Sequence, residues 1–348
     1  MTDMTTHATP EERPAKGAAG PTLPREKLLR IHDLMIEGRL LEERLIRMQR
    51  QGEAYFWIGG PGEEAFNTCL GLLADRGQGI HHDYFHLHYR SSATLLALGG
   101  QSIDALRQMH NTVTDPHSRG RNFCGHFSVR EWNLVPITSP IEVQYSVAIG
   151  TGLAQARQGG RGITIVQGGD AGTAEGDFAT CLVWASRPVE PLPMLIIVAN
   201  NAWGISTPAA GQHGEKRIAD RGAAFGMKTM TCDGNDVEAA YAAIKEAMHY
   251  VRTERKPLVL ECFLSRLYGH SSSSGANYVE DEPDCMKILA DRLDRRGWRS
   301  NAETKAITEA KEAEMTAWYK QVLTEPKPDA SEVHMFTFAE RNHVGGEA

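Results

Sequence analysis

Two short apolar runs with a helical segment between them constrain the fold of this chain more than any other feature of its sequence. Residues 163–167 and 194–198 are rich in aliphatic side chains and have the length of buried β-strands. Residues 175–186 between them read as a helix. A strand, a helix and a second strand in this order predict a βαβ unit, in which the two strands run parallel.

The rest of the chain continues this alternation of helices and strands. Further expected elements are helices over 25–51, 237–252 and 303–322, a helical stretch after Gly62, and strands over 228–232 and 258–262. No internal repeat and no linker is evident. We therefore predict an α/β fold with a parallel sheet that is covered by helices on both faces.

The two ends of the chain differ in character from this central part. Residues 1–24 carry acidic side chains and lack the apolar middle of a signal peptide, so we predict a disordered tail. We expect one α/β domain over 25–325 and a C-terminal tail over 326–348. The predicted location is the cytoplasm.

Composition excludes several other classes of protein. The net charge is −7 and the basic residues are scattered, so nucleic acid is not an expected partner. No apolar run reaches the roughly 18 residues of a membrane helix. The 6 cysteines lie far apart without a CxxC pair, which argues against a zinc site and a disulfide framework.

Polar residues at the ends of the two strands predict a site for a metal and a phosphate. Asp170 follows the first strand and Asn201 follows the second, and ligands of such sheets bind at the carboxyl ends of strands. Each residue offers a hard oxygen, which suits Mg²⁺. Glycines 168, 169, 172 and 176 and the start of a helix would let a phosphate approach the backbone. The alternative is an ordinary glycine-rich turn of a doubly wound protein; a dinucleotide site is disfavoured because GGDAGTAEG lacks GxGxxG spacing.

The segment GGDAGTAEGDF…VANNAWGISTP resembles the signature of thiamine-diphosphate enzymes, an acidic turn followed after about thirty residues by two asparagines. Other blocks match one family in order: Phe56, 62–65, Tyr89-Arg90, 120–128, 137–144, 233–237 and 266–273. From about residue 25 to 300 the chain resembles the alpha subunits of the first component of 2-oxo acid dehydrogenases, of the pyruvate, branched-chain and acetoin types.

The resemblance implies a cofactor and a set of site residues. Mg²⁺ would be held by Asp170, Asn201 and the backbone carbonyl of Trp203. Thiamine diphosphate would be contacted by Tyr89, Arg90, Ser139, Ile141, Asp170, Ala171, Gly172, Asn201 and His270. The two catalytic residues would be His126 and His270, which could move protons near neutral pH while the cofactor carries out the decarboxylation.

Two features near His270 have further implications. Its loop, 269–275, is rich in Gly and Ser and reads as a mobile segment that could order over bound cofactor. In some relatives the Ser directly after this His is phosphorylated, and Ser271 occupies that position. A lone histidine among the 14 of this chain would ordinarily be structural, so the assignment depends on the motif around it.

A second group of histidines precedes Tyr89. It consists of His81, His82, Asp83, His86 and His88. On a helix, His82 and His86 would share one face, as zinc ligands can, but no HExxH pattern is present. We therefore favour a lining for the channel to the cofactor over a metal site.

Thiamine enzymes also need a second α/β domain, and this chain contains one. The resemblance therefore implies a separate beta subunit, a tetramer of two alpha and two beta chains, and a lipoyl-bearing acyltransferase core as the next partner. The expected function is oxidative decarboxylation of a 2-oxo acid with acyl transfer to a lipoyl group, with the ITSPIEVQ block favouring a branched-chain substrate. The alternatives are pyruvate or acetoin as substrate, and a weakly active regulatory subunit that binds cofactor.

The chain departs from the family pattern at three places. Ala171 then Gly172 replaces the usual Gly then Ala. Val143 stands where branched-chain members have a Thr that helps to hold a monovalent cation. Ser274 and Gly275 replace an acidic residue in the His270 loop, which bears on how that loop orders.

Overall fold

The apolar runs of the sequence form the centre of a five-stranded parallel sheet. The computed structural model describes residues 22–334. The strands are β1 (Tyr84–His86), β2 (Thr164–Gly169), β3 (Met194–Asn200), β6 (Lys228–Asp233) and β7 (Leu258–Phe263). They lie in the order β1-β2-β3-β7-β6, and every neighbouring pair is parallel. The predicted βαβ unit is thus confirmed, with β2 and β3 side by side.

Alternate residues of each central strand pack against opposite faces of the sheet. Ile165, Leu195 and Leu260 belong to one buried cluster. Val166 and Ile196, each one position along, belong to a second cluster on the other face. Both faces are therefore apolar, which explains the continuous apolar runs in the sequence.

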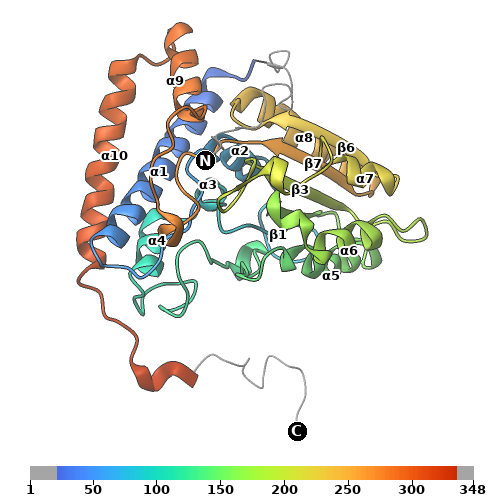
Figure 1. Cartoon of the computed structure of the whole chain (residues 1–348), viewed down its shortest axis with the longest axis horizontal. Helices are drawn as coiled ribbons and strands as arrows, with labels where there is room; N and C mark the ends of the chain where they lie inside the picture. The colour runs from blue at the N-terminus through green and yellow to red at the C-terminus, as the bar shows by residue number, and fades with distance from the viewer. Residues whose placement is uncertain (1–21, 335–348) are drawn as a thin grey trace.

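Helices cover both faces of the sheet (Figure 1). One cluster joins the sheet to α2 (Glu64–Leu73) and α8 (Val237–Glu254). The other joins it to α5 (Val143–Arg157) and α6 (Gly176–Ala185), near the short α7 (Asp220–Ala224). The predicted α/β fold, with helices on both faces of a parallel sheet, is confirmed.

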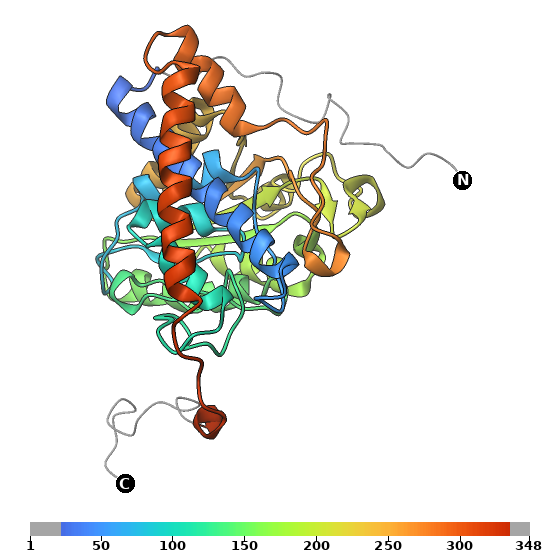
Figure 2. The same cartoon turned by 90° about the vertical axis from the view of Figure 1, so that its left-hand side faces the viewer.

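A further layer of helices packs beside α2, away from the sheet (Figures 1 and 2). It comprises α1 (Arg25–Arg50), α3 (Ser92–Leu98), α4 (Ser102–Met109), α9 (Cys285–Arg295) and α10 (Asn301–Val322). The start of α10 is a capping box, in which Ser300 and Glu303 each accept a hydrogen bond from the other's backbone amide. In Figure 2 α10 crosses in front of α1, with which it shares a third buried cluster.

The remaining regular elements are short. They are β4 (Trp203–Gly204) paired with β5 (Thr207–Pro208), and the 3-10 helices η1 (Arg130–Trp132), η2 (Ala171–Ala174), η3 (Ala209–Gly211), η4 (Ser272–Ser274) and η5 (Ala330–His334). β1, α3, α4, α5, α7 and α9 were not predicted from the sequence. Most of them are short, and α5 lacks a clear apolar period, so packing partners decide their structure; α9 buries Cys285, Leu289 and Leu293 at helical spacing, a pattern that the sequence analysis missed.

The predicted tails lie largely outside the described residues. Residues 1–21 and 335–348 are not described, and the boundaries of the single domain, 25–325, stay a prediction. The first residues of the predicted C-terminal tail contact the rest of the chain, since the amide of Val113 donates to the carbonyl of Pro326 at 2.9 Å.

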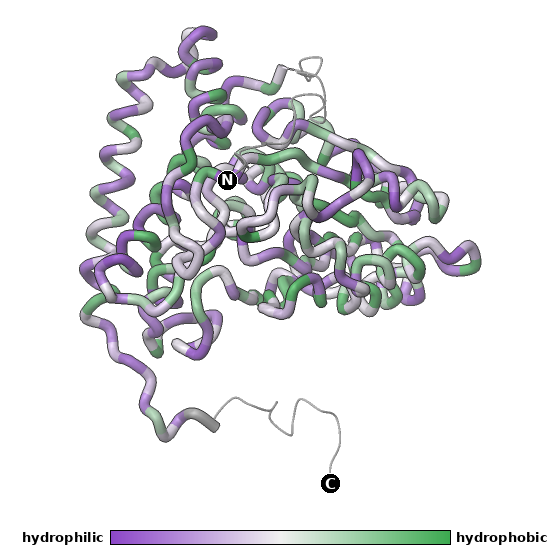
Figure 3. The backbone as a smooth tube through the Cα atoms, viewed as in Figure 1, coloured by the Kyte–Doolittle hydropathy of each residue, from purple (hydrophilic) through white to green (hydrophobic). Residues whose placement is uncertain are grey.

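Apolar residues concentrate inside the fold, where the strands are green in Figure 3, whereas α10 is largely polar. No helix among the described residues is long and apolar enough to cross a membrane. All six cysteines are buried and free. They pack as small apolar side chains.

Candidate active site

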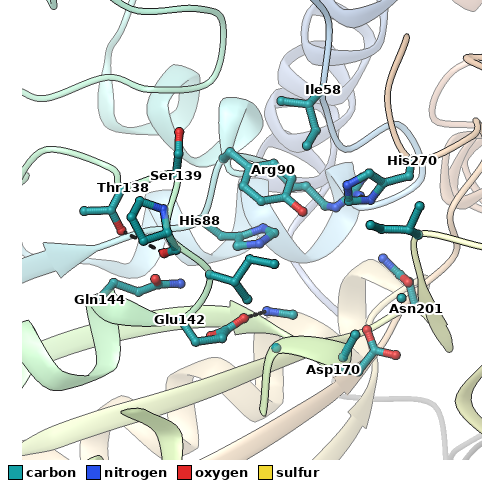
Figure 4. A pocket seen from close by; sticks show the side chains of 18 of the residues that line it. Ile58, His88, Arg90, Thr138, Ser139, Glu142, Gln144, Asp170, Asn201 and His270 are labelled. Atoms are coloured by element: carbon teal, nitrogen blue, oxygen red, sulfur yellow. Dashed lines mark hydrogen bonds between the residues drawn. The ribbon is translucent and has the colours of Figure 1, made fainter. Parts of the chain in front are cut away.

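A cavity of about 270 Å³ opens at the carboxyl edge of the sheet. Its lining includes all the residues that the sequence assigned to the site: Tyr89, Arg90, His126, Ser139, Ile141, Asp170, Ala171, Gly172, Asn201, Trp203 and His270. Figure 4 shows Thr138 and Ser139 on one side of the cavity and Asp170, Asn201 and His270 on the other. The structure thus brings together residues that are widely separated in the sequence.

Strand register explains why Asp170 and Asn201 meet. Gly169 of β2 lies opposite Ala199 of β3, so both parallel strands end at the same edge of the sheet. Asp170 is the first residue after β2, and Asn201 is the first residue after β3. In Figure 4 the Asn201 amide lies next to the Asp170 carboxyl.

The surroundings of Asp170 fit a divalent cation. Its side chain is 1% exposed, and its Oδ2 has no hydrogen-bond partner among the described residues. Burial raises the pKa of Asp170 to about 7, and hydrogen bonds from backbone amides only partly offset this effect. A buried carboxylate with a free oxygen is a suitable Mg²⁺ ligand, because the cation would supply the missing partner.

Glu63 orients the Asn201 amide. The Asn201 Nδ2 donates to Glu63 Oε1 at 3.4 Å, and Arg90 Nε lies 3.9 Å from the same oxygen. Burial raises the pKa of Glu63 to about 7. Because the Asn201 nitrogen faces Glu63, its oxygen faces away from that carboxyl. This oxygen accepts a hydrogen bond from the Trp203 amide at 3.1 Å and keeps its second lone pair for a ligand.

Arg90 and His270 form a hydrogen-bonded pair in the wall of the cavity. Arg90 Nη2 donates to His270 Nδ1 at 2.9 Å, and Arg90 Nη1 donates to the carbonyl of Gly59. Since a guanidinium only donates, the neutral His270 ring carries its proton on Nε2. Burial and the charges of Arg90 and Arg266 lower the pKa of His270 to about 4, which keeps the ring neutral at pH 7.

His126 has the opposite tautomer. Its Nδ1 lies 3.0 Å from the carbonyl of Cys124, which can only accept, so the proton is on Nδ1. Its Nε2 then accepts a hydrogen bond from the Ser139 hydroxyl at 2.8 Å. Burial lowers the pKa of His126, and its ring stacks on Tyr89 at 6.5 Å between centroids. His126 and His270 therefore carry their protons on different ring nitrogens.

The loop after His270 is held in place by the chain itself. Ser272 N donates to the carbonyl of Trp57 at 2.8 Å, and Trp57 N donates to Ser272 Oγ at 3.0 Å. Ser271 and Ser274 form a capping box at η4, and Ser271 is buried. Ser274, where the family has an acidic residue, is thus part of the loop's own hydrogen-bonding.

We expected the histidines before Tyr89 to line the channel to the cofactor. Of that group only His88 lines the cavity, so the expectation is wrong for the other members. Residues 84–86 form strand β1 rather than a helix, and no group of three potential metal ligands is found within residues 22–334. Asp83 pairs with Arg252, and His86 bonds Thr151 at 2.8 Å, so both face the scaffold. His88 lines the cavity because it follows the end of β1 at the ligand-binding edge.

Several residues of the cavity were not singled out from the sequence as site residues. The polar ones are Thr138, Glu142 and Gln144, and the others are Phe56, Ile58, Phe123, Pro140, Gly204 and Ile205; His88 and Gly169 were named from the sequence as a channel lining and as part of a phosphate-binding turn. Burial lowers the pKa of His88 well below its ordinary value. Glu142 is the one acidic residue of the ITSPIEVQ block, and this is the signal that could have identified it as a cavity residue.

Comparison with known proteins gives a consistent family. The sequence profile of the family "Dehydrogenase E1 component" matches residues 32–331. The chain is 32% identical to 2-oxoisovalerate dehydrogenase subunit alpha of Pseudomonas aeruginosa, over 88% of this chain and 75% of that protein. It is 30% identical to 2-oxoisovalerate dehydrogenase subunit alpha 1, mitochondrial, of Arabidopsis thaliana, over 88% and 67%.

A third relative is 2-oxoisovalerate dehydrogenase subunit alpha, mitochondrial, of Dictyostelium discoideum, which is 29% identical over 82% of this chain and 65% of that protein. The chain therefore spans about two thirds to three quarters of the length of these relatives. The resemblance inferred from the sequence blocks is confirmed at the level of the family. The chain belongs to the dehydrogenase E1 component family and is similar to its alpha subunits.

Proposed function

We propose that this chain is the alpha subunit of a branched-chain 2-oxo acid dehydrogenase that uses thiamine diphosphate and Mg²⁺. Its reaction would be the oxidative decarboxylation of a 2-oxo acid and transfer of the acyl group to a lipoyl group. The observation that carries the proposal is the convergence on one cavity of the eleven residues that the resemblance implied, in a chain of this family. The names of the relatives support a branched-chain substrate.

Family membership implies thiamine diphosphate as the cofactor, which supplies the carbanion chemistry of decarboxylation when bound. Arg90 offers a charged donor to a diphosphate, although part of its guanidinium is already used by Gly59 and His270. The His270 Nε2–H is a donor. The Ser139–His126 hydrogen bond gives a neutral base at Nε2 that could receive a proton.

Mg²⁺ would be held by Asp170, Asn201 and the backbone carbonyl of Trp203. The free Oδ2 of Asp170 supports this assignment, as does the orientation that Glu63 imposes on the Asn201 amide. Mg²⁺ prefers an octahedral coordination with few protein ligands, completed by phosphate oxygens and water.

The family also implies a beta subunit as partner, which would make a tetramer of two alpha and two beta chains. The exposed side chains of Ile141 (58%) and Ile205 (50%) at the cavity support a partner that covers this edge. The neighbouring helices α5 and α6 expose Val147, Val183 and Trp184. A lipoyl-bearing acyltransferase core as further partner and a cytoplasmic location stay predictions.

The proposal is tested by decarboxylation assays of this chain co-expressed with its beta-chain partner, with thiamine diphosphate and Mg²⁺ present. Turnover of 3-methyl-2-oxobutanoate faster than of pyruvate, and absent without the partner, is the expected result. His270→Ala should abolish most of this turnover while the circular dichroism spectrum is retained. Near-normal activity of His270→Ala would rule out its catalytic role.

Other outcomes distinguish the alternatives. Activity on pyruvate alone would keep the family and change the substrate. Cofactor binding without turnover of any 2-oxo acid would support the weakly active regulatory subunit. His126 and His270 argue against that alternative, because a subunit that binds cofactor without chemistry needs Asp170 and Asn201 but has no physical need for both histidines.

A further inference from the structure

Glu142 occupies an unusual position at the edge of the cavity. It precedes the first residue of α5 with a φ of 64°, in the left-handed region that glutamate rarely adopts. Its side chain is 2% exposed. The preceding residues Ser139 and Ile141 line the cavity, so a strained and buried glutamate joins that wall to the helix behind it.

The Glu142 carboxyl is directed at the turn that carries Asp170. Its Oε1 accepts a hydrogen bond from the backbone amide of Gly169 at 3.0 Å, the contact drawn between Glu142 and its neighbour in Figure 4. Gly169 directly precedes Asp170. The bond therefore connects the wall of the cavity to the residue that would bind the metal.

The glycines of this turn leave room for the carboxyl. A Cβ at Gly168 would lie 1.9 Å from Glu142 Oε2, and a Cβ at Gly172 would lie 1.9 Å from Glu142 Oε1. No side chain at either position is compatible with Glu142 in this place. The same contact explains why Ala171 precedes Gly172 in this chain. A Cβ at position 172 would collide with the Glu142 carboxyl, so that position is the glycine.

A second contact joins the same two segments. Gln144 Nε2 donates to the carbonyl of Gln167 in β2 at 3.1 Å. The start of α5 is therefore bonded twice to the end of β2, through Gln144 and through Glu142. Glutamine has the same length and the same acceptor oxygen as glutamate, so it is a close substitute at this contact.

We propose that Glu142 is a positioning residue that locks the Asp170 turn against the Ser139–Ile141 wall. It holds the metal-binding side and the opposite wall of the cavity in one fixed arrangement. What matters is the length and acceptor oxygen of the side chain rather than its charge. The contacts are those of the chain itself, whereas the consequence for cofactor binding rests on the proposed function.

Two variants of Glu142 separate the effect of side-chain length from the effect of charge. Glu142→Gln keeps the reach and the acceptor oxygen, and Glu142→Asp keeps the carboxyl but is one methylene too short for Gly169. Aspartate tolerates the left-handed backbone region better than most residues, so this variant should fold. Glu175→Ala is the matched control, since Glu175 is an exposed carboxylate close in sequence to the same turn.

The first readout needs no cofactor. Hydrogen exchange followed by mass spectrometry should show faster exchange, by about tenfold or more, for a peptide spanning 167–173 in Glu142→Asp. Exchange of a β3 peptide should stay unchanged. Glu142→Gln and Glu175→Ala should behave as the wild type at both peptides.

The second readout is calorimetric binding of thiamine diphosphate with Mg²⁺ to the chain co-expressed with its partner. Glu142→Asp should raise the Kd about tenfold, and Glu142→Gln should leave it within about threefold. Normal exchange and affinity in Glu142→Asp, or a defect in Glu142→Gln as large as in Glu142→Asp, would overturn the proposal. If the wild type binds no cofactor, the proposed function fails, and hydrogen exchange alone decides the role of Glu142.

Discussion

At the scale of single residues, the buried carboxyl of Asp170 has an oxygen without a hydrogen-bond partner among the described residues, as a metal ligand would. Burial raises the pKa of this carboxyl to about 7. We expect Asp170→Ala to abolish Mg²⁺-dependent binding of thiamine diphosphate, as measured by calorimetric titration with and without the metal. Asp220→Ala, at an exposed aspartate, serves as the control. Retained affinity in Asp170→Ala would remove the metal assignment.

Glu42 is a second buried carboxyl, outside the proposed metal site. It accepts hydrogen bonds from Trp57 Nε1 at 3.0 Å and from Ser92 Oγ at 2.6 Å. Burial raises its pKa from 4.5 to about 7. The folded protein therefore binds this proton more tightly than the unfolded chain does, and the group favours folding most when it is protonated.

This shift predicts a specific pH dependence of stability. Relative to Glu42→Gln, the free energy of unfolding of the wild type should fall as pH rises from about 4.5 to about 7, by on the order of 3 kcal/mol, and then level off. The Ser92 hydroxyl can turn to accept from the new amide. Urea unfolding at a series of pH values measures the difference. A difference that is constant over this range would contradict the raised pKa.

At the scale of secondary-structure elements, the edge strand β1 is anchored by an ion pair from α8. Arg252 donates to both oxygens of Asp83 at 2.7 and 2.6 Å, and the Asp83 side chain is 0% exposed. The amide of Ile163 also donates to Asp83 at 3.0 Å, which joins β1 to the start of β2. The position of His88 and Tyr89, directly after β1, depends on this anchor.

Removal of the cation should leave a buried carboxylate without its partner. We expect Arg252→Met to lower the free energy of unfolding by about 3 kcal/mol, and Arg252→Met with Asp83→Asn to recover part of the loss. Urea unfolding provides the measurement. Lys228→Met, which breaks the exposed pair with Glu246, should have a much smaller effect. Equal losses in the two single variants would show that burial of Asp83 has no special effect.

At the scale of the whole molecule, the exposed apolar side chains near the cavity bear on assembly. Val147 on α5 is 50% exposed, and it lies in the first turns of the helix that begins at the cavity edge. If a beta chain covers this edge, Val147→Asp should reduce co-purification and the fraction of tetramer in size-exclusion chromatography. The reason is that a charge would be buried in the contact.

The control for this prediction is another exposed valine. Val189 is 98% exposed and lies between α6 and β3, at the opposite end of the strands. Val189→Asp should leave the assembly unchanged, and neither change should lower the melting temperature of the chain alone. Unchanged assembly of Val147→Asp would place the partner on another surface.

Much of this molecule follows from the sequence because its signals are local. Apolar runs such as 163–167 and 194–198 predict buried parallel strands, and their ends predict where Asp170 and Asn201 lie. The short strand β1 and helix α5 escaped prediction because their own residues carry no decisive period. The expected channel lining by the histidines before Tyr89 was wrong for His86 because pairing with β2 decides that segment.

The sequence by itself determined the α/β class, the βαβ unit and the meeting of Asp170 with Asn201, because neighbouring parallel strands place their carboxyl ends at the same edge of the sheet. Only the tertiary structure decided the protonated nitrogens of His126 and His270, the role of Glu63 and the place of Glu142. The Arg90–His270 bond spans 180 residues, and the Glu142 carboxyl fits only where two glycines leave room. Contacts of this kind depend on the packing of distant segments, which no local pattern records.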